Sequence, residues 1–488
     1  MYKVPTTIEV SGLNLEWFKL SLLHRDDLPS DVRNSPKFIE LNNSREAMSI
    51  TAINATAQYI SKIWEVFYDD LQKVIPDPYI QITVTVPVVW PSHARQMMHK
   101  ALHEAGILNK KVELAPKFVA EPEAAALAFF SAAYYLQQPQ SSILEPGQIL
   151  IVCDCGGGTV DTASYEISSV HPFRVKEVLP GQCILAGVCL LDDAFMQLLK
   201  DKVEKMTSPR AFQALTESDF HRIVYNHWEL DMKVYFSDSY PTKHIDLPTK
   251  WAASRQKRMP VGQEVDITFT QCELASIFDP IVGKIISLIE MEVNKVSISP
   301  SKDVSHLIVA GGFGQNAYLR QKITQTVNRV SPTTNILDYP NRKGWNAVSQ
   351  GAVIQALQAQ TNQQPVLVTS RIARASWGVR ASDGNSVFWL VRENESLDAT
   401  SPNLRLLPAE ALSADDPARS DVFNIRPHQD VCRLSWKTVD VGLKSDTNAD
   451  LKAPLQIEFI WDGAKMEFSL LYGGVQQSSV KVEHNWEV

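Results

Sequence analysis

The chain has 488 residues, and a typical domain length of about 150 residues predicts roughly three domains. Hydrophobic residues make up 44% and charged residues 21%, a globular mixture that excludes an intrinsically disordered chain. The formal charge of −8, from 47 basic and 55 acidic residues, excludes an overall field that attracts nucleic acid or an anionic membrane.

Targeting and cysteine patterns favour a reducing compartment. Residues 1–5 open no apolar signal-peptide core, and the longest small-and-apolar run, 124–136, is too short to cross a bilayer. Six cysteines are too sparse for a disulfide framework in a chain of this length. We therefore expect a soluble, cytoplasmic, multidomain protein without nucleic-acid or membrane partners.

Strand-like and helix-like stretches alternate over the first two-thirds of the chain. Apolar residues recur every three or four positions from Ile53 to Val74, which predicts a helix, and alternate over 80–86, which predicts a strand. Residues 91–105 predict another helix, ended by Gly106. Further predicted strands are 148–154, 160–167, 174–179, 265–270 and 304–310. Further predicted helices are 191–205, 217–236, 273–296, 317–327 and 345–358. This mixture indicates an α/β or α+β architecture.

Two stretches lack helical periodicity. The polar segment 237–260, with its basic cluster at 255–258, is interpreted as a solvated loop. After a linker-like break at 360–365, residues 457–461 and 466–470 alternate around Asp462-Gly463, which predicts a hairpin. Residues 366–488 are therefore expected to be β-rich.

The most informative segment is a glycine loop between two predicted strands. Gly156, Gly157 and Gly158 weaken a strand, but without Cβ atoms they let backbone N–H groups surround phosphate oxygens. Asp154 and Asp161 flank the loop and could hold the water shell of Mg²⁺. A flexible glycine-rich hairpin is the alternative, but these acids and the neighbouring threonine hydroxyl together favour phosphate chemistry.

A second apolar strand also ends in glycines, at Gly311 and Gly312. A predicted helix follows, and its N-terminal amides could face an anion or a ribose. The segment is not Gly-x-Gly-x-x-Gly, and the chain contains no Gly-Lys-Ser/Thr loop. This pattern argues against a Rossmann dinucleotide site and against a P-loop.

These two loops resemble the two halves of the actin-like ATPase fold, and in particular the seventy-kilodalton heat-shock chaperone family. Within it the sequence is similar to the divergent branch of heat-shock 70 kDa protein 12 and its fungal relatives. Residues 154–161 resemble the family's second phosphate loop, and 309–319 its adenosine loop. Other matching segments, in chain order, are 84–90, 119–126, 228–233 and 370–378. The resemblance implies a two-lobed α/β ATPase domain followed by a small β-rich domain.

The resemblance implies a site for Mg²⁺ with ATP or ADP. The residues that would cradle the β- and γ-phosphates are Gly156, Gly157, Gly158 and Thr159. Asp154 would lie beside Mg²⁺ and the attacking water, with Asp161 supporting the metal shell. Glu121 would orient that water, so the implied catalytic residues are Asp154, Glu121 and Thr159.

On the nucleoside side, the resemblance implies three further elements. Gly187 would form a third phosphate-side turn, although hydrophobic residues and Cys189 follow it where small polar or acidic residues would suit a phosphate. Glu229 and Lys233 would contact ribose and adenine. The adenosine loop would comprise Gly311, Gly312 and Phe313.

The sequence departs from the family in one main respect. The family's first phosphate loop, a strand followed by Asp-x-Gly-Thr-Thr, has no counterpart here, so we expect an N-terminally incomplete ATPase domain. Losing one preorganised donor of this kind can cost about 10²–10³-fold in rate. Lys19 is a candidate for the lysine that approaches the γ-phosphate.

The expected domains are a first lobe over 1–165, a second lobe over 166–362 and a β-rich domain over 363–488. The leading function is Mg-ATP binding by an ATP-dependent chaperone that hydrolyses ATP to ADP and phosphate. Its partners would be nucleotide and an unfolded peptide or a co-chaperone. The alternatives are a catalytically inactive interaction scaffold or a truncated gene product. A sugar or acetate kinase would need a first phosphate loop and an acceptor base, and neither is identified.

Overall fold

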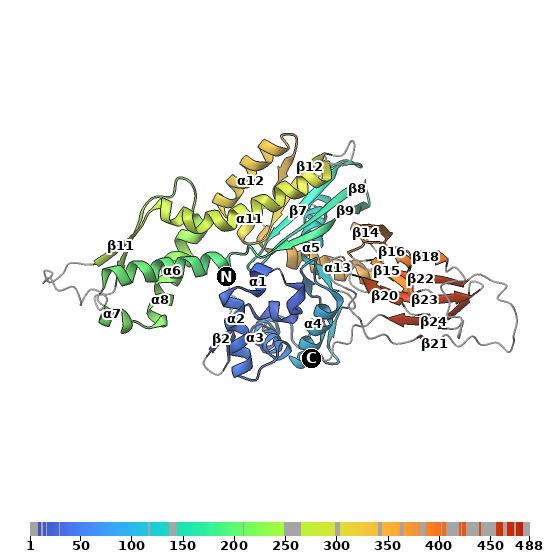
Figure 1. Ribbon diagram of the computed structural model, residues 1–488, viewed down its shortest axis with the longest axis horizontal. Coiled ribbons are helices and arrows are strands. Elements are labelled where there is room, and N and C mark those ends of the chain that lie inside the picture. Colours follow the sequence, from blue (N-terminus) through green and yellow to red (C-terminus); the bar gives the residue numbers. More distant parts are fainter. Residues whose placement is uncertain are drawn as a thin grey trace.

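A seven-stranded mixed sheet organises the chain (Figure 1). The computed structural model describes residues 8–10, 13–15, 17–28, 30–115, 118–135, 144–207, 209–247, 265–297, 303–339, 344–361, 366–374, 376–380, 387–401, 403–406, 419–420, 422–425, 439–440, 455–461, 466–472 and 475–481. The sheet order is β13-β12-β7-β8-β9-β14-β17. These strands are β7 (Ile149–Cys155), β8 (Val160–Val170), β9 (Phe173–Ile184), β12 (Val304–Ala310), β13 (Asn335–Leu337), β14 (Val366–Ile372) and β17 (Ser396–Asp398).

Helices cover both faces of this sheet, and β7 shows why. All of its residues are buried, and because successive side chains of a strand point to opposite faces, they divide between two cores. Ile149, Ile151 and Cys153 belong to the core that includes α6 (Cys189–Met206), α11 (Gln271–Ser297) and α12 (Ala317–Val330). Leu150 and Val152 belong to the core that includes α5 (Glu121–Tyr135) and α13 (Ala347–Thr361). Figure 1 shows α11 and α12 on one side of the strands and α5 on the other.

The described part of the segment before the sheet forms helices of 3 to 21 residues, one antiparallel strand pair and two parallel strand pairs. Its helices are η1 (Phe18–Leu22), η2 (Arg25–Asp27), α1 (Ser30–Arg33), α2 (Pro36–Ala47), α3 (Ala52–Gln72) and α4 (Ser92–Glu104). Its strands are β1 (Ile8–Val10), β2 (Leu13–Leu15), β3 (Ile80–Ile82), β4 (Thr85–Val86), β5 (Val112–Leu114) and β6 (Val119–Ala120). The predicted strand at 80–86 is interrupted, because its partners β5 and β6 are themselves separated along the chain.

Between β9 and β12 the chain adds helices and a hairpin. These elements are α7 (Pro209–Gln213), α8 (Glu217–Ile223), the π-helix η4 (Val224–Met232), α9 (Lys233–Tyr235), β10 (Lys243–Leu247) and β11 (Val265–Phe269). The short helices η5 (Phe313–Gln315) and η7 (Gly344–Asn346) precede α12 and α13. The loop predicted over 237–260 is wrong for β10, whose Ile245 and Leu247 are buried while His244 and Asp246 alternate outward. The basic cluster at 255–258 lies outside the described residues.

The remaining described elements confirm the β-rich C-terminal region. They are β15 (Ser376–Arg380), β16 (Val387–Val391), β18 (Asn403–Leu406), β19 (Arg419–Ser420), β20 (Val422–Ile425), β21 (Val439–Asp440), β22 (Leu455–Trp461), β23 (Met466–Tyr472) and β24 (Val475–Lys481). The predicted hairpin is confirmed by the antiparallel pairing of β22 with β23, in which Phe459 lies opposite Phe468. Its turn residues, Asp462-Gly463, lie outside the described part of the chain.

One expected domain limit falls inside a strand and the other just after a helix. Residue 165 lies inside β8, so β7 and the first half of β8 share one sheet with β9, β12 and β13. The limit at 362 follows the end of α13 directly. The three-part division stays a prediction. Within the described ranges, no helix is both long enough and apolar enough to cross a bilayer.

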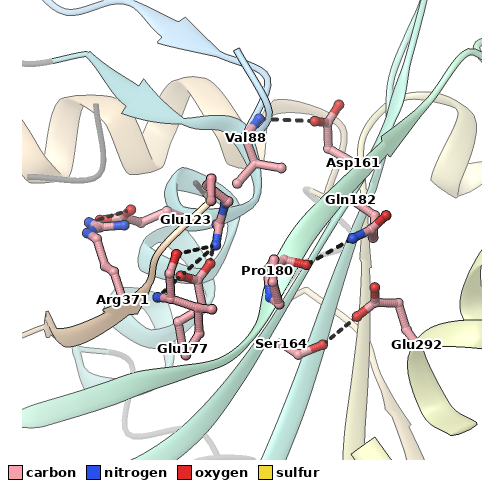
Figure 2. A network of polar contacts seen from close by, with 11 residues as sticks. Val88, Glu123, Asp161, Ser164, Glu177, Pro180, Gln182, Glu292 and Arg371 are labelled. Carbon is pink, nitrogen blue, oxygen red and sulfur yellow. Dashed lines mark hydrogen bonds and ion pairs between the residues drawn. The ribbon is translucent and has the colours of Figure 1, made fainter. Parts of the chain in front are cut away.

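Buried ion pairs tie β14 and the residues after it to the helix and strand beside them (Figure 2). Arg371 Nη2 lies 2.8 Å from a carboxylate oxygen of Glu123, in the first turn of α5. The Glu177 carboxylate on β9 accepts hydrogen bonds from the backbone N–H of Ile372 at 2.8 Å and from both terminal guanidinium nitrogens of Arg374. Side-chain exposure is only 16% for Arg371 and 7% for Glu123. The pair therefore fixes the position of β14 relative to α5.

Arg371→Ala should destabilise the fold by about 3–5 kcal/mol, because it leaves the Glu123 carboxylate buried without its cation. Urea unfolding followed by circular dichroism measures this change. Lys62→Ala is the control, since the Lys62–Glu65 pair is exposed and its loss should cost less than about 1 kcal/mol. Equal destabilisation by the two variants would contradict a structural role for the buried pair.

Candidate functional site

The glycine loop joins two strands whose acids face each other. Asp154 on β7 lies directly opposite Asp161 on β8, and the Gly156 N–H donates to the Thr159 carbonyl at 3.0 Å to close the turn. Gly157 and Gly158 are exposed, and a Cβ atom on either would meet nothing within 4 Å. Within the described ranges, the backbone N–H groups of these two glycines have no hydrogen-bond partner. The loop thus offers open backbone donors beside two carboxylates.

The turn at Gly187 holds this loop by backbone hydrogen bonds. The Gly187 N–H donates to the Gly158 carbonyl at 3.0 Å, and the Cys189 N–H donates to the Gly157 carbonyl at 3.0 Å. A Cβ atom at Gly187 would lie 2.3 Å from the Gly157 carbonyl oxygen, so only glycine fits. The N–H of Gly187 is therefore engaged by the loop, and the first turn of α6 is held against it.

The two facing aspartates are buried and incompletely satisfied. Asp161 Oδ1 accepts the Val88 N–H at 3.1 Å (Figure 2). Asp161 Oδ2 and Asp154 Oδ1 are buried without a hydrogen-bond partner. Burial, together with the Glu121 and Asp161 charges, raises the pKa of Asp154 well above its ordinary value. Burial and the Glu121 charge raise the pKa of Asp161 to about 7, against hydrogen bonds from Thr159 and Val88. The positive charge near these two carboxylates therefore compensates them only in part.

Glu121 and Lys19 complete this acidic cluster. Glu121 is the first residue of α5, and its Oε1 lies 2.9 Å from Lys19 Nζ in η1. Burial opposes the charged form of Lys19, but its bond to Glu121 and the Asp161 charge raise its pKa above the ordinary value. The cluster thus holds three carboxylates and one ammonium, an excess of negative charge that favours a bound cation.

The donor set fits Mg²⁺ better than a fully protein-coordinated metal. Among the described residues, no three His, Cys, Asp or Glu side chains are placed to hold a metal ion together. Mg²⁺ commonly keeps several waters and uses one or two carboxylates with substrate phosphates. The unpartnered oxygens of Asp154 and Asp161, next to open glycine N–H groups, match that pattern.

The second glycine segment packs directly against the first. Gly311 follows β12, has φ +81°, and donates its N–H to the Gly344 carbonyl at 2.9 Å. A Cβ atom there would lie 2.2 Å from the Cys155 carbonyl oxygen and 2.6 Å from Asp154 Oδ1. Gly312 is open, whereas the Phe313 side chain is buried in the core. Gly311 thus allows β12 to end against the Asp154 carboxylate.

Glu229 and Lys233 lie together on an unusual helix. The π-helix η4 carries Glu229 and is followed by Lys233, whose ammonium lies 2.5 Å from Glu229 Oε1. π-Helical segments occur frequently at functional sites. Asn316, at the start of α12, donates its side-chain amide to the Lys233 carbonyl at 3.0 Å. The sequence predicted a helix here but gave no sign of its π geometry.

Asp192 is a candidate site residue that the sequence analysis missed. It lies in the first turn of α6, with Oδ1 2.8 Å from Lys233 Nζ and 2.6 Å from Trp228 Nε1. The available signal was an acid five positions after Gly187 at the start of a predicted helix. That signal is weak, because acids are common in the first turn of any helix.

The structure therefore groups the predicted residues in two linked clusters. The first contains the glycine loop with Asp154, Asp161, Glu121 and Lys19. The second contains Asp192, Glu229 and Lys233 beside Asn316. Helix α6 joins them, because Cys189 bonds the glycine loop and Asp192 bonds Lys233. Gly311 contacts the first cluster, and Asn316, five residues further along the chain, lies beside the second.

Asp161→Asn should make the stability of the metal-free protein less dependent on pH. The pKa of Asp161 rises from an ordinary value near 3.8 to about 7 on folding, so the folded state keeps a proton that the unfolded chain has released. The resulting stabilisation is present below pH 4 and is lost as the pH rises to 7. Asparagine does not ionise, and its amide oxygen can still accept the Val88 N–H. The variant should therefore gain stability relative to wild type as the pH rises from about 4 to about 8.

Thermal unfolding in EDTA across this pH range measures the difference. Asp231→Asn is the control with the opposite sign, because hydrogen bonds from Lys243 and Tyr240 outweigh its partial burial and lower the pKa of Asp231. Parallel pH profiles for wild type and Asp161→Asn would contradict the buried, uncompensated state of Asp161.

Two comparisons show what this chain is similar to. A family profile described as "Hsp70 protein" matches residues 24–403. Chaperone protein DnaK of Stenotrophomonas maltophilia (strain R551-3) is 24% identical over 311 residues, which are 61% of this chain and 43% of DnaK. The chain thus matches less than half the length of this curated relative. The divergent branch expected from the sequence stays a prediction. Because the family match spans well over half of the 488 residues, the chain belongs to the Hsp70 protein family.

Proposed function

We propose that this chain binds Mg-ATP at the glycine loop and hydrolyses it to ADP and phosphate. One observation carries the proposal: the exposed N–H groups of Gly157 and Gly158 lie beside two buried aspartates that each keep one unpartnered oxygen. Backbone donors suit phosphate oxygens, and carboxylates with retained water suit Mg²⁺. The same loop therefore matches both components of a magnesium nucleotide. Family membership is consistent with this nucleotide chemistry.

The protein groups would bind and orient the nucleotide. Asp154 and Asp161 would hold Mg²⁺, which when bound offsets the negative charge of the β- and γ-phosphates. The loop N–H groups and the Thr159 hydroxyl would donate to phosphate oxygens, and Lys19 would add a positive charge. At the other cluster, Glu229 and Lys233 would contact ribose and adenine.

Hydrolysis would be an in-line displacement at the γ-phosphorus. A bond forms from the water oxygen to phosphorus, the bond to the β,γ-bridging oxygen breaks, and ADP leaves. Glu121 would orient the water and accept its proton, since its carboxylate lies at the start of α5 within the acidic cluster. The Lys19 ammonium, 2.9 Å from Glu121, would hold that carboxylate in place.

A chaperone role is the broader part of the proposal. The relative from Stenotrophomonas maltophilia is named a chaperone protein, although the match covers 43% of its length. In this chain, the strands from β15 to β24 would bind an unfolded peptide or a co-chaperone. β14 gives such a region a physical connection to the ATPase domain, because it pairs with β9 and is held to α5 by Arg371.

Calorimetric titration with Mg-ADP and Mg-ATP tests binding. Wild type should bind with a dissociation constant of about 1 µM or lower, near −8 kcal/mol. Gly157→Asp should abolish binding, because a carboxylate would enter the phosphate position while the open site tolerates its bulk. Gly283→Asp is the matched control, since this glycine is also open and exposed but lies on α11, which carries none of the proposed site residues. Absence of heat from folded wild-type protein would contradict nucleotide binding.

Glu121→Gln should leave Mg-ATP binding within a few-fold of wild type and slow single-turnover hydrolysis by about 10²–10⁴-fold. Rapid-quench measurement of ADP formation checks this rate. If the variant and wild type cleave ATP equally, Glu121 does not orient the water. If wild type binds ATP without cleaving it, the chain is an inactive scaffold on this fold.

A further inference from the structure

Asp192 holds a defined position between the two clusters of the site. It lies three residues after Cys189, or about 4.5 Å along the axis of α6. Cys189 donates its N–H to the carbonyl of Gly157, so this helix is attached to the phosphate side. The carboxylate of Asp192 meets Lys233 at the other cluster. Its distance from the glycine loop is thus set by one rigid helical turn.

Two donors hold one oxygen of this carboxylate and leave the other open. Oδ1 accepts the indole N–H of Trp228 at 2.6 Å and the Lys233 ammonium at 2.8 Å. Trp228 is fully buried and stacks on Phe195 with ring centroids 4.4 Å apart, which fixes its N–H. Oδ2 has no hydrogen-bond partner among the described residues, and the side chain is 31% exposed. One acceptor is therefore oriented and accessible.

The charge of this cluster favours ligands that donate hydrogen bonds. The Lys233 ammonium is shared by Asp192 and Glu229, so two carboxylates surround one cation. The Lys233 carbonyl accepts a hydrogen bond from Asn316, which lies within the segment that resembles the adenosine loop. A ribose presents two neighbouring hydroxyl donors, and in Rossmann dinucleotide sites a carboxylate accepts a hydrogen bond from such a hydroxyl.

We propose that Asp192 is a specificity-determining residue that accepts a hydrogen bond from a ribose hydroxyl, so that the chain prefers ribonucleotides to deoxyribonucleotides. This inference rests on the proposed function and adds Asp192 to the residues expected at the nucleoside. The discrimination arises because a site built around a hydroxyl donor leaves its acceptor unpaired when the hydroxyl is missing. A purely structural Asp192 would instead only neutralise Lys233.

Calorimetric titrations with Mg-ATP, Mg-2′-deoxy-ATP and Mg-3′-deoxy-ATP test the inference. Wild type should bind ATP about tenfold or more tightly than at least one deoxy analogue, since one charge-assisted hydrogen bond contributes at least about a factor of ten. Asp192→Asn keeps an oxygen for Trp228 but presents an amide donor in place of Oδ2. It should weaken ATP binding about tenfold while leaving the discriminated analogue nearly unchanged, so the preference disappears.

Asp193→Asn is the matched control, because Asp193 is the next residue of α6 and forms an exposed ion pair with Lys37. It should keep the preference of the wild type for ribonucleotides. A wild-type preference below about twofold would overturn the inference without any variant, even if Asp192→Asn fails to fold. Equal weakening of ATP and both analogues by Asp192→Asn would also overturn it and make Asp192 structural.

Different results would contradict nucleotide binding and the role of Asp192. If wild type binds none of the three nucleotides, the proposed function fails and the inference fails with it. If wild type binds ATP and both deoxy analogues equally, nucleotide binding stands and only the role of Asp192 is lost. Loss of the preference in Asp192→Asn but not in Asp193→Asn supports the inference.

Discussion

The close approach of the two glycine segments is the constraint on which the site depends. Strands β7 and β12 are parallel neighbours, and both end at the same edge of the sheet. At Gly311 the approach is so tight that a Cβ atom would lie 2.2 Å from the Cys155 carbonyl oxygen. The positive φ of this glycine and its missing side chain let β12 end beside Asp154. A larger residue would push the two loops apart and separate the proposed metal side from the nucleoside side.

Around that contact the fold maintains an electrostatic imbalance. Lys19 is the cation that the described residues place against Glu121, Asp154 and Asp161, and burial raises the pKa of both aspartates. Such an arrangement is costly without a ligand, because buried charge requires a partner. Binding a cation would therefore also stabilise the folded state by linkage. The same charges that lower the stability of the ligand-free protein would make the site selective for a magnesium nucleotide.

Rigid connections transmit the geometry of this site to the rest of the molecule. Helix α6 joins the glycine loop to Asp192 and Lys233 through backbone and side-chain hydrogen bonds. On the other face of the sheet, Arg371 joins β14 to the first turn of α5, two residues from Glu121. Both connections use buried or half-buried charges, whose loss leaves an unpaired group. The glycine loop, the cluster around Lys233 and strand β14 are thus linked through the central sheet and the helices packed on it.

The sequence by itself determined the local features of this protein. Three glycines between two aspartates, the helical period before Val74 and the alternation around Asp462 each depend on neighbouring residues. Only the tertiary structure decided which distant groups meet. Lys19 and Glu121 are 102 positions apart, and Lys233 and Asp192 are 41 apart, so no local pattern joins them. The strand β10 was missed because its partner β11 lies beyond a long polar segment. A local sequence pattern indicates on which face of a helix or strand a side chain lies. Packing between distant elements determines which other side chain it contacts.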